Sequence, residues 1–430
     1  MGQALWGRGL RVDLSFVIPA LDERENLKAL IPGLRKVVGG LGLTHEIIVI
    51  DGGSRDGTPA VASDLGARVI SQDTRGYGSA LRLGLHAAEG EYVLTLDADL
   101  SHAPAVVVDL WSARSQSGIV IASRYVPGGA AKVSLPRTIL SRALNVVFAR
   151  GLSLGVRDLS SGYRLYPRHV FETLHSRGED FDVLPEILVR AYAAGWRVLE
   201  VPFRYEPRAS GQSKARLVRL GKAYMVTFAR LWRLRNSIQA ADYDERAFES
   251  VIPLQRAWQR RRHAIVMART DAGGVPMLDI GCGSSRIIRD RPQAIGVDIR
   301  IDKLRYMSRY GLRLVAASIF DLPFHEASFN TIICSEVIEH VSSGLRPFQE
   351  LARVQRTGGR LILGTPDYGR WSWRAIEACY RVLTPGGYAD EHITQYRHDD
   401  LVALVENMGY RHLETDYVFG SEMILTFVKT

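Results

Sequence analysis

One apolar segment that runs into a pair of aspartates constrains the first half of this chain more than any other feature. Residues 94–96 alternate leucine with threonine, which suits a short buried strand, and Asp97 and Asp99 follow it directly. In α/β sheets the carboxyl ends of the strands form the edge where ligands bind. Two carboxylates held there repel each other, and a hard divalent cation would neutralise them and keep positions open for phosphates. The alternative for an isolated D-x-D is a pair of solvated turn aspartates.

Strand-like and helix-like segments alternate along the first half of the sequence. Residues 14–18, 46–50 and 68–70 are β-rich apolar runs, and helical patterns follow up to residue 34 and over residues 75–90. This alternation predicts an α/β fold with an open, mostly parallel sheet. In that topology Asp22, Asp51 and the 97/99 pair lie on one edge. An acidic side chain there can accept hydrogen bonds from a base or ribose, while Asp97 and Asp99 take the metal.

A second set of glycine turns and acidic strand ends begins near residue 277. Residues 277–280 predict a strand that runs into Gly281-Cys282-Gly283, and the next strand ends at Asp298, about twenty residues beyond Asp279. This is the pattern of a nucleoside-binding βαβ unit. The glycines let the ligand approach the backbone, and the acid accepts hydrogen bonds from ribose hydroxyls.

The length of 430 residues predicts two or three domains, and 46% hydrophobic residues suffice for ordinary globular cores. We place a first domain at residues 1–235, a charged helical linker at 236–275 and a second domain at 276–430. Three cysteines are too few and too scattered for a disulfide framework or a cysteine zinc site, which favours a reducing compartment.

The formal net charge of +9 favours an anionic partner: a nucleotide, a phospholipid head group or a nucleic acid. We interpret the arginine run at 260–262 as a solvated helix face and expect no nucleic-acid partner. No uncharged apolar run reaches the length of about eighteen residues that marks a membrane-spanning helix. We therefore expect a cytoplasmic protein that associates peripherally with the cytoplasmic face of the membrane.

The segment 214–235 interleaves apolar and basic residues. A basic helix with tryptophan and phenylalanine on its apolar part can lie in a membrane interface. The alternative is a helix that packs back on the first domain with a solvated basic side. The residues concerned are Leu217, Leu220, Met225, Phe228, Leu231, Trp232 and Leu234, with Arg216, Arg219, Lys222, Arg230, Arg233 and Arg235 between them.

Four motifs in order give the first half a family resemblance. They are V-I-P-A-x-D-E-R-E-N-L at 17–27, I-I-V-I-D-G-G-S-R-D-G-T at 47–58, R-G-Y-G-S-A at 75–80 and L-D-A-D-L-S-H-A-P at 96–104. Together with S-R-Y at 123–125, S-G-Y-R-L-Y at 161–166 and G-Q-S-K at 211–214, they resemble family-2 glycosyltransferases of the GT-A fold. Within that family the chain is most similar to the polyprenyl-phosphate (dolichol-phosphate) mannose synthases. One departure is Gly52, which stands where such enzymes usually have the second of two paired aspartates.

The resemblance implies metal-dependent, inverting transfer of a hexose, with mannose expected, from a GDP- or UDP-sugar to a polyprenyl or dolichyl phosphate. The metal, Mg²⁺ or Mn²⁺, would be held by Asp97 and Asp99. The implied residues for the nucleotide sugar are Pro19, Ala20, Asp22, Glu23, Asp51, Gly76, Asp97 and Ala98. The implied catalytic residues are Asp99, Arg124, Arg208 and Lys214, and those for the acceptor phosphate are Arg124, Arg137, Arg142 and Ser213. A lipid phosphate is already anionic, so it needs cations and no general base.

A sugar hydroxyl in polysaccharide or glycolipid assembly is the alternative acceptor. Relatives that use hydroxyl acceptors take a base from an acidic motif, and the E-D-F-D sequence at 179–182 lies at about the right place.

The second half resembles class I S-adenosylmethionine-dependent methyltransferases with a Rossmann-like fold. The motifs are D-L-P-F at 321–324, S-F-N-T-I-I at 328–333, E-V-I-E-H at 336–340 and R-V-Q-R-T-G-G-R-L at 353–361. Departures are Ser285 at the third small position of the glycine turn and Asn330 in place of a common aspartate. The resemblance implies an S-adenosylmethionine site made of Asp279, Gly281, Gly283, Asp298, Asp321 and Glu336.

The sequence thus predicts a bifunctional transferase, with a glycosyltransferase fused to a methyltransferase that acts on a related glycan or lipid. A hydroxyl acceptor would want a general base, and His340 or His392 could serve. The alternative is that the second half is a non-catalytic binding or scaffolding module.

Overall fold

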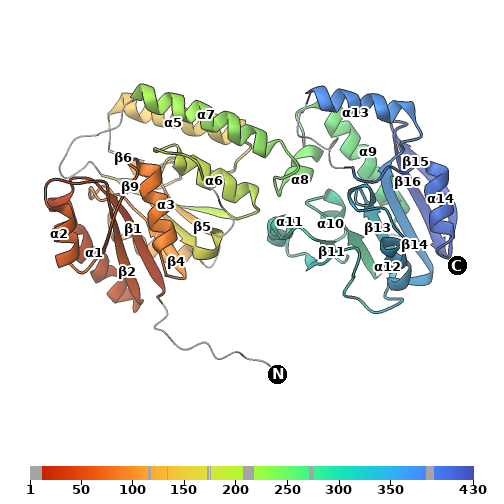
Figure 1. The fold of residues 1–430 in the computed structure, drawn as a ribbon, viewed down its shortest axis with the longest axis horizontal. Helices are drawn as coiled ribbons and strands as arrows, with labels where there is room; N and C mark the ends of the chain where they lie inside the picture. The colour runs from red at the N-terminus through yellow and green to blue at the C-terminus, as the bar shows by residue number, and fades with distance from the viewer. Residues whose placement is uncertain are drawn as a thin grey trace. The chain divides into compact units, whose positions relative to one another are not determined.

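The structure is a computed structural model that describes residues 12–114, 118–132, 134–171, 174, 176–206, 217–270, 276–383 and 392–430. The chain divides into two compact units (Figure 1). The first unit comprises Met1–Tyr192 and Trp196–Arg233, and the second comprises Ala193–Gly195 and Leu234–Thr430. Among the residues described, no helix has the length and apolar character needed to cross a membrane.

The first unit is built on a seven-stranded sheet in the order β3-β2-β1-β4-β7-β5-β8. The strands are β1 (Leu14–Ala20), β2 (His45–Asp51), β3 (Arg68–Ser71), β4 (Tyr92–Thr95), β5 (Ile119–Ser123), β7 (Arg164–Pro167) and β8 (Val198–Pro202). Strand β7 runs antiparallel to β4 and β5, and the other pairings are parallel. The strand order changes direction between β1 and β4, which places the ligand edge of the sheet at their carboxyl ends.

Seven helices accompany this sheet in the described residues: α1 (Arg24–Leu41), α2 (Thr58–Asp64), α3 (Tyr77–Ala87), α4 (Val106–Ala113), α5 (Leu135–Gly151), α6 (Val183–Ala193) and α7 (Leu217–Arg235). Helices α5 and α7 lie side by side in a separate layer (Figure 1), and Phe148 of α5 contacts Tyr224 and Phe228 of α7. A two-stranded sheet of β6 (Ala130–Ala131) and β9 (Arg204–Tyr205) completes the unit, with a short 3-10 helix at Arg168–Val170.

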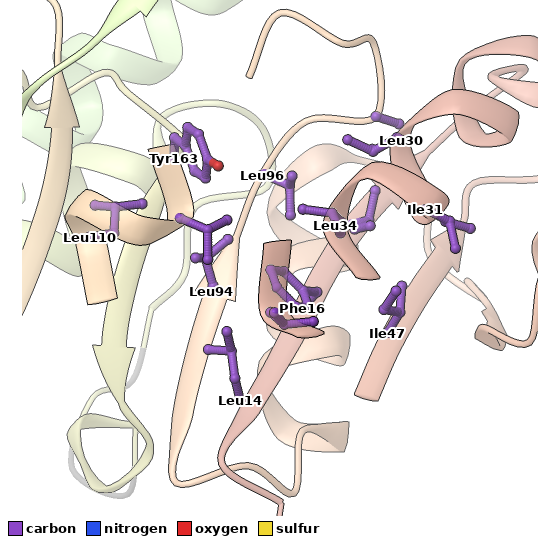
Figure 2. Close-up of a cluster of buried hydrophobic side chains, with 14 of the residues drawn as sticks. Leu14, Phe16, Leu30, Ile31, Leu34, Ile47, Leu94, Leu96, Leu110 and Tyr163 are labelled. Carbon is purple, nitrogen blue, oxygen red and sulfur yellow. The ribbon is translucent and has the colours of Figure 1, made fainter. Parts of the chain in front are cut away.

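The core of the first unit forms on both faces of β1, because its sequence LSFVIPA is apolar apart from Ser15 and all but one of its residues are buried. On one face Phe16 packs with Leu30 and Leu34 of α1 (Figure 2). Burial of each such side chain contributes about 1.5–3 kcal/mol to stability. On the other face α3 approaches β1 closely at Gly84, where a Cβ atom would lie 2.3 Å from Cγ1 of Val17. Only glycine allows this approach.

The second unit has a seven-stranded sheet in the order β12-β11-β10-β13-β14-β16-β15. The strands are β10 (Met277–Ile280), β11 (Ile295–Asp298), β12 (Arg313–Ala316), β13 (Phe329–Ser335), β14 (Gln355–Pro366), β15 (Tyr410–Val418) and β16 (Glu422–Lys429). The first five run parallel in the 3-2-1-4-5 order of a doubly wound nucleotide-binding sheet. Strand β16 is antiparallel to both of its neighbours.

The helices of the second unit are α8 (Tyr243–Phe248), α9 (Pro253–Arg269), α10 (Arg286–Asp290), α11 (Ile301–Met307), α12 (Arg346–Val354), α13 (Trp371–Leu383) and α14 (His398–Glu406). Two 3-10 helices cover Ser308–Tyr310 and Ile338–His340. Helices α8 and α9 fall inside the segment that the sequence suggests as a linker, yet α9 packs on the sheet. Trp258 and Arg262 of α9 both donate hydrogen bonds to the buried carboxylate of Glu422 in β16.

Candidate active sites

A large cavity of about 1640 Å³ opens at the carboxyl ends of β1 and β4 in the first unit. Parallel strands bring residues that are distant in sequence to this edge. Seven of the eight residues predicted for the nucleotide sugar line it: Pro19, Ala20, Asp22, Glu23, Gly76, Asp97 and Ala98. The eighth, Asp51, is buried at the end of β2. Asp99 and Arg124 line the same cavity.

Asp97 and Asp99 differ in their surroundings. The side chain of Asp97 is 29% exposed, and the Tyr77 hydroxyl donates to its Oδ1 at 3.3 Å. Nδ1 of His102 accepts the backbone N–H of Asp97, so a neutral His102 carries its proton on Nε2, which lies 3.8 Å from Asp97 Oδ2. Burial lowers the pKa of His102, although the nearby aspartates oppose that shift. Asp99 is nearly buried, and its Oδ1 accepts hydrogen bonds from the backbone N–H and hydroxyl of Ser101.

These two carboxylates fit a divalent cation. Both present hard oxygen ligands to one cavity, and among the described residues no lysine or arginine pairs with Asp97.

Asp22 and Asp51 shape the loop that follows β2. Both carboxylate oxygens of Asp51 accept the backbone N–H of Ser54, and one also accepts that of Gly53. Asp22 has a left-handed backbone, with φ of 57°, and its Oδ1 accepts the backbone N–H of Arg55 at 2.9 Å. The loop is therefore fixed against the end of β1.

The turn before α3 packs tightly against residues 178–181. At Gly76, whose φ is 135°, a Cβ atom would lie 2.5 Å from the carbonyl oxygen of Glu179. The next residue, Tyr77, stacks on Phe181 with ring centroids 4.4 Å apart and reaches Asp97 with its hydroxyl. Tyr77 and Phe181 are not among the predicted site residues, although they lie within the R-G-Y-G-S-A and E-D-F-D motifs.

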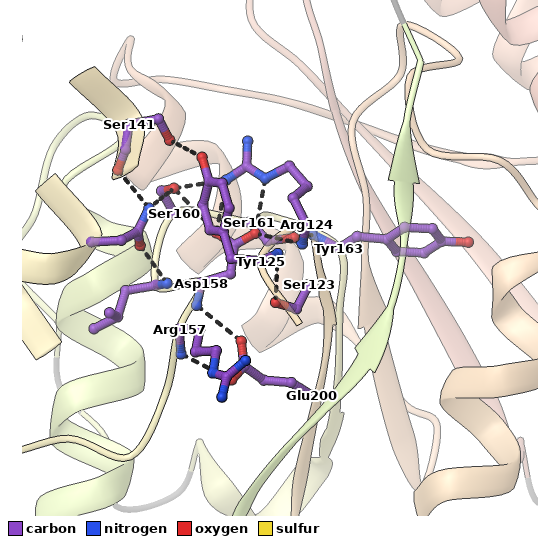
Figure 3. Close-up of polar contacts among 12 residues, drawn as sticks. Ser123, Arg124, Tyr125, Ser141, Arg157, Asp158, Ser160, Ser161, Tyr163 and Glu200 are labelled. Atoms are coloured by element: carbon purple, nitrogen blue, oxygen red, sulfur yellow. Dashed lines mark hydrogen bonds and ion pairs between the residues drawn. The ribbon is translucent and has the colours of Figure 1, made fainter. Parts of the chain in front are cut away.

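Arg124 is held by a hydrogen-bond network that the sequence did not predict (Figure 3). Nε and Nη2 of Arg124 donate to the two oxygens of Asp158 at 2.8 and 2.7 Å, and Nη2 also donates to Ser160. Burial alone would lower the pKa of Arg124, but the hydrogen bonds and the charge of Asp158 hold it above its ordinary value. Asp158 precedes the S-G-Y-R-L-Y motif by three residues, and this position was the one sequence signal that could have identified it. Arg164 of that motif is fully buried and donates to the carbonyls of Leu159 and Ser161, which fixes the loop.

The far end of the cavity is apolar and lies between α5 and α7. Its lining residues there are Leu140, Leu144, Val147 and Phe148 of α5 with Tyr224, Met225 and Phe228 of α7. One continuous cavity therefore joins a polar, carboxylate-bearing end to an apolar end.

Of the cationic side chains predicted to bind the acceptor phosphate, only Arg124 is seen to line this cavity among the described residues. Arg142 is exposed on α5, and its guanidinium lies 5.6 Å from the ring centroid of Tyr125. The side chain of Arg137 and the residues Arg208, Ser213 and Lys214 lie outside the described residues.

The predicted basic surface of α7 needs a correction. Arg235 is fully buried in a two-point ion pair with Asp242, and Arg230 pairs with buried Glu186 at 3.1 Å. Each of these arginines neutralises a buried carboxylate; Arg235 is shielded from solvent, whereas the side chain of Arg230 stays 31% exposed. Lys222 and Arg233 are exposed, beside exposed Met225, Val226 and Trp232.

The acidic residues of the E-D-F-D sequence lie in different environments. Asp180 lines the cavity, whereas Asp182 is buried and accepts a hydrogen bond from Thr227 of α7 at 2.8 Å. Glu179 is exposed.

The glycine turn of the second unit follows β10. Gly281 and Gly283 have φ of 65° and 51°, and a Cβ atom on Gly281 would lie 2.1 Å from Cγ2 of Val337. Asp298 at the end of β11 accepts the backbone N–H groups of Gly283 and Arg300, both at 2.8 Å. A carboxylate has lone pairs left for ribose hydroxyls after these two bonds.

Asp279 is buried below this turn. Burial first, and then the charge of Asp298, raises its pKa to about 8, and its Oδ2 has no hydrogen-bond partner among the described residues. Two further predicted residues lie apart: Asp321 is exposed, and Glu336 pairs with Arg262 at 3.0 Å. The turn geometry and the acidic strand ends fit a nucleoside such as that of S-adenosylmethionine.

Asp244 of α8 also lies at this turn, and no sequence motif predicted it. It accepts hydrogen bonds from Nζ of Lys303 at 2.8 Å and from the backbone N–H of Ser284, and it lies beside Gly283. The charge of Lys303 and the bonds from Ser284 overcome the effect of burial and lower its pKa to about 2. Helix α8 therefore belongs to the candidate cofactor site.

The folds of the two units are typical of two classes of transferase. The first unit has the mixed sheet of the GT-A type, with an aspartate pair beside the cavity, and the second has the strand order of Rossmann-like methyltransferase domains. Residues 15–174 match glycosyl transferase family 2, and residues 278–363 match a methyltransferase domain. The chain belongs to glycosyl transferase family 2 and carries a methyltransferase domain in its second half, as predicted.

Curated relatives match the first half. The chain is 32% identical over 231 residues to a dolichol-phosphate mannosyltransferase of Pyrococcus furiosus, which covers 51% of this chain and 63% of that protein, less than two thirds of its length. It is 33% identical over 216 residues to a polyprenol monophosphomannose synthase of Mycolicibacterium smegmatis, covering 46% of this chain and 79% of that protein.

Among solved structures, the chain is similar to glucosyl-3-phosphoglycerate synthase of Mycobacterium tuberculosis in complex with Mn²⁺, UDP and glucosyl-3-phosphoglycerate. The TM-score is 0.41 at 22% identity, with 53% of this chain and 86% of that chain covered.

Proposed function

We propose that the first unit transfers a hexose, with mannose expected, from a nucleotide sugar to a polyprenyl phosphate, and that the second unit methylates a related glycan or lipid. The single observation that carries the first part is the continuous cavity with a polar end and an apolar end. An acceptor that is anionic at one end and hydrocarbon at the other matches both. The names of the relatives, a dolichol-phosphate mannosyltransferase and a polyprenol monophosphomannose synthase, support the same acceptor class.

The roles of the residues follow from their positions. Asp97 and Asp99 would hold Mg²⁺ or Mn²⁺, which supplies Lewis-acid stabilisation of the leaving diphosphate. The fixed loop of residues 52–55 and the turn at Gly76 border the space for the nucleotide. A phosphate oxygen of the acceptor attacks the anomeric carbon, and the bond from that carbon to the diphosphate oxygen breaks with inversion. Arg124 lines the cavity with its guanidinium already oriented by Asp158, so little side-chain entropy is lost when it binds a phosphate.

The membrane supplies such a lipid, and α5 and α7 present a suitable surface. Their exposed apolar side chains are Leu135, Ile139, Leu140, Val146, Val147, Met225, Val226 and Trp232. Exposed basic residues accompany them at Arg142, Lys222 and Arg233. We propose that these two helices lie in the membrane interface on the cytoplasmic face, so that the apolar end of the cavity meets the lipid.

A donor panel with polyprenyl phosphate in detergent micelles tests the first activity. We expect transfer from a GDP- or UDP-hexose, and a raised KM for the lipid but not for the donor in Leu140→Gln and Met225→Gln. Ile139→Gln is the matched control, because Ile139 and Leu140 are both 59% exposed but only Leu140 lines the cavity. Transfer to a sugar hydroxyl instead, abolished by Asp180→Asn, would replace the lipid phosphate with the alternative acceptor.

The second activity is tested by calorimetric binding of S-adenosylmethionine to the full chain and by transfer of a labelled methyl group to the product of the first unit. Binding without transfer to glycans or lipids would favour a non-catalytic module.

A further inference from the structure

Three ligand-type side chains meet in the second unit beyond the turn that follows β13. The nearest donor atoms of Glu339, His340 and His392 all lie within 4.8 Å of one another. The rings of the two histidines are 5.1 Å apart between centroids. Glu339 and His340 come from the short helix Ile338–His340, and His392 comes from a distant part of the chain.

Backbone bonds hold this grouping together. The carbonyl oxygen of Glu339 accepts the N–H groups of Ile393 and Thr394, at 2.8 and 3.0 Å, and the hydroxyl of Thr394 donates to the carbonyl of Val341. The segment that carries His392 is therefore anchored directly on the segment that carries Glu339 and His340. The meeting of the three side chains does not depend on the rotamer of a single exposed residue.

Two polar atoms in the group have no partner among the described residues. Glu339 is fully buried, and its Oε2 accepts a hydrogen bond from Thr365, but its Oε1 has none. His392 bonds to the Tyr368 hydroxyl through Nδ1, while its buried Nε2 has none. A buried polar atom without a hydrogen-bond partner destabilises the folded chain, because it has lost its hydration without compensation. A bound cation would satisfy both atoms.

The local charge favours a cation as well. Glu339 interacts electrostatically with Glu336 and Glu422. Arg262 forms ion pairs with both of those carboxylates.

The backbone on the approach to this cluster is strained. Glu336, directly after β13, has a left-handed φ of 59°, which is costly for a residue with a Cβ atom. Strain of this kind persists where the surrounding structure enforces it and is concentrated at functional sites.

We propose that Glu339, His340 and His392 bind a divalent transition-metal ion, with an open coordination position towards the adjacent small cavity. Two imidazoles and one carboxylate suit Zn²⁺ and related ions rather than Mg²⁺ or Ca²⁺. Zinc ligands at about 2.1 Å from the metal lie roughly 3.4 Å apart, so small side-chain rotations close the site from the present spacing.

The cavity next to the site measures about 60 Å³ and is lined by His392 with Trp258, Trp373, Glu336 and Glu377, among others. It has room for one or two water molecules, at about 30 Å³ each. Three protein ligands plus a solvent position is the arrangement of catalytic rather than structural zinc sites. The open position would take an oxygen ligand: water, or a hydroxyl of the methyl acceptor. The identity of that second ligand rests on the proposed methyl transfer, whereas metal binding does not.

Cobalt titration of the full-length chain tests the site, with Asp97→Asn and Asp99→Asn introduced so that the first unit contributes no metal. After removal of metals with a chelator, we expect one equivalent of Co²⁺ to bind with visible absorption bands and to be displaced by Zn²⁺. Loss of groups that merely orient ligands costs about 10–100-fold in metal affinity, so His392→Gln and Glu339→Gln should each weaken Co²⁺ binding by at least about tenfold.

His398→Gln is the matched control, since this histidine bonds to Asp399 and Thr415 elsewhere in the unit and should leave Co²⁺ binding unchanged. Thermal unfolding of the metal-free proteins checks that each variant folds. If Glu339→Gln does not fold, the His392→Gln variant alone tests the site, because His392 is only half-buried. Absence of saturable Co²⁺ binding, or equal binding by the parent and both variants, would overturn the site. Methyl transfer measured on the same samples is a separate readout, so the metal site can fail while the proposed methyl transfer stands.

Discussion

Arg124 and Asp158 form a two-point ion pair in which the carboxylate is fully buried and the guanidinium borders the cavity. The backbone N–H of Arg124 donates to the same carboxylate, and Glu200 holds the N–H groups of Arg157 and Asp158 (Figure 3). The pair therefore fixes both a cationic side chain and the loop on which the S-G-Y-R-L-Y motif begins.

Breaking one half of this pair should destabilise the first unit. Asp158→Asn leaves a partly buried guanidinium uncompensated, and Arg124→Gln does the same to a buried carboxylate, so each should lower the free energy of unfolding by about 3–5 kcal/mol. The double variant should lose less than the sum. Urea unfolding of all four proteins measures this coupling; additive losses would contradict it.

The pH dependence of this pair has a definite sign. Burial alone would raise the pKa of Asp158, but Arg124 holds it below the ordinary value. A depressed folded-state pKa means that the stabilisation is present above the unfolded-state pKa and is lost as pH falls through the folded-state pKa. The difference between parent and Asp158→Asn should therefore persist at neutral pH and vanish only in acid.

Sugar transfer should depend on the two aspartates after β4. Asp97→Asn keeps the shape but removes the charge that would hold the cation, so the rate should fall by about 10²–10³-fold, as for the loss of one group that stabilises developing negative charge. Asp99→Asn should be at least as severe. Activity is measured as transfer of labelled sugar during Mn²⁺ titration. Exposed Asp73→Asn is the control, and a folded Asp97→Asn protein with near-normal metal-dependent activity would remove the assignment.

Membrane association should depend on the exposed apolar residues of α5 and α7. Val146→Glu with Val226→Glu places two charges on this surface and should reduce binding to anionic vesicles in co-sedimentation. High salt should weaken binding of the parent, because each basic residue near such a surface contributes about 1 kcal/mol. Val251→Glu with Leu254→Glu, at apolar positions of the second unit that are even more exposed, is the control. If both double variants bind vesicles equally well, α5 and α7 do not contact the membrane and serve only to pack on the first unit.

Asp279 should make the stability of the second unit fall as pH rises. Its pKa is raised to about 8 by burial and by Asp298. Folding then takes up a proton between about pH 4 and pH 8, and the free energy of unfolding decreases across that window. Asp279→Asn, which is neutral throughout, should flatten the profile. Chemical unfolding of the second unit at a series of pH values gives the measurement, and identical slopes for both proteins would be inconsistent with a buried, protonated Asp279.

The second unit should fold alone when it begins at Leu234. A fragment that begins after Arg269 loses α8 and α9, with the bonds of Asp244 to Ser284 and Lys303 and those of Arg262 to Glu422. We expect cooperative unfolding and S-adenosylmethionine binding for residues 234–430, and neither for residues 270–430. Cooperative unfolding and S-adenosylmethionine binding by residues 270–430 would place α8 and α9 outside the domain, in agreement with the predicted boundary at 276.

The sequence predicted much of this protein because its strongest signals are local. Continuous apolar runs such as β1 indicate strands buried on both faces, and glycine–aspartate turns mark the strand ends. The α/β class and both family resemblances, carried by ordered motifs, are confirmed. The individual site residues stay predictions, although the structure gathers seven of the eight nucleotide-sugar candidates at one cavity.

Pairings between distant elements were decided only by the tertiary structure. Nothing local to Arg230 or Arg235 shows that they pair with the buried carboxylates of Glu186 and Asp242, so the sequence alone indicated a solvated basic face. The Arg124–Asp158 pair, the apolar channel between α5 and α7, and the meeting of Glu339 with His392 likewise join residues from separate segments. A sequence pattern indicates which side chains are buried, because burial of one face of a helix or strand repeats apolar residues at a regular spacing. Which charge or ligand meets them there depends on how the strands and helices pack, and that is a property of the folded chain.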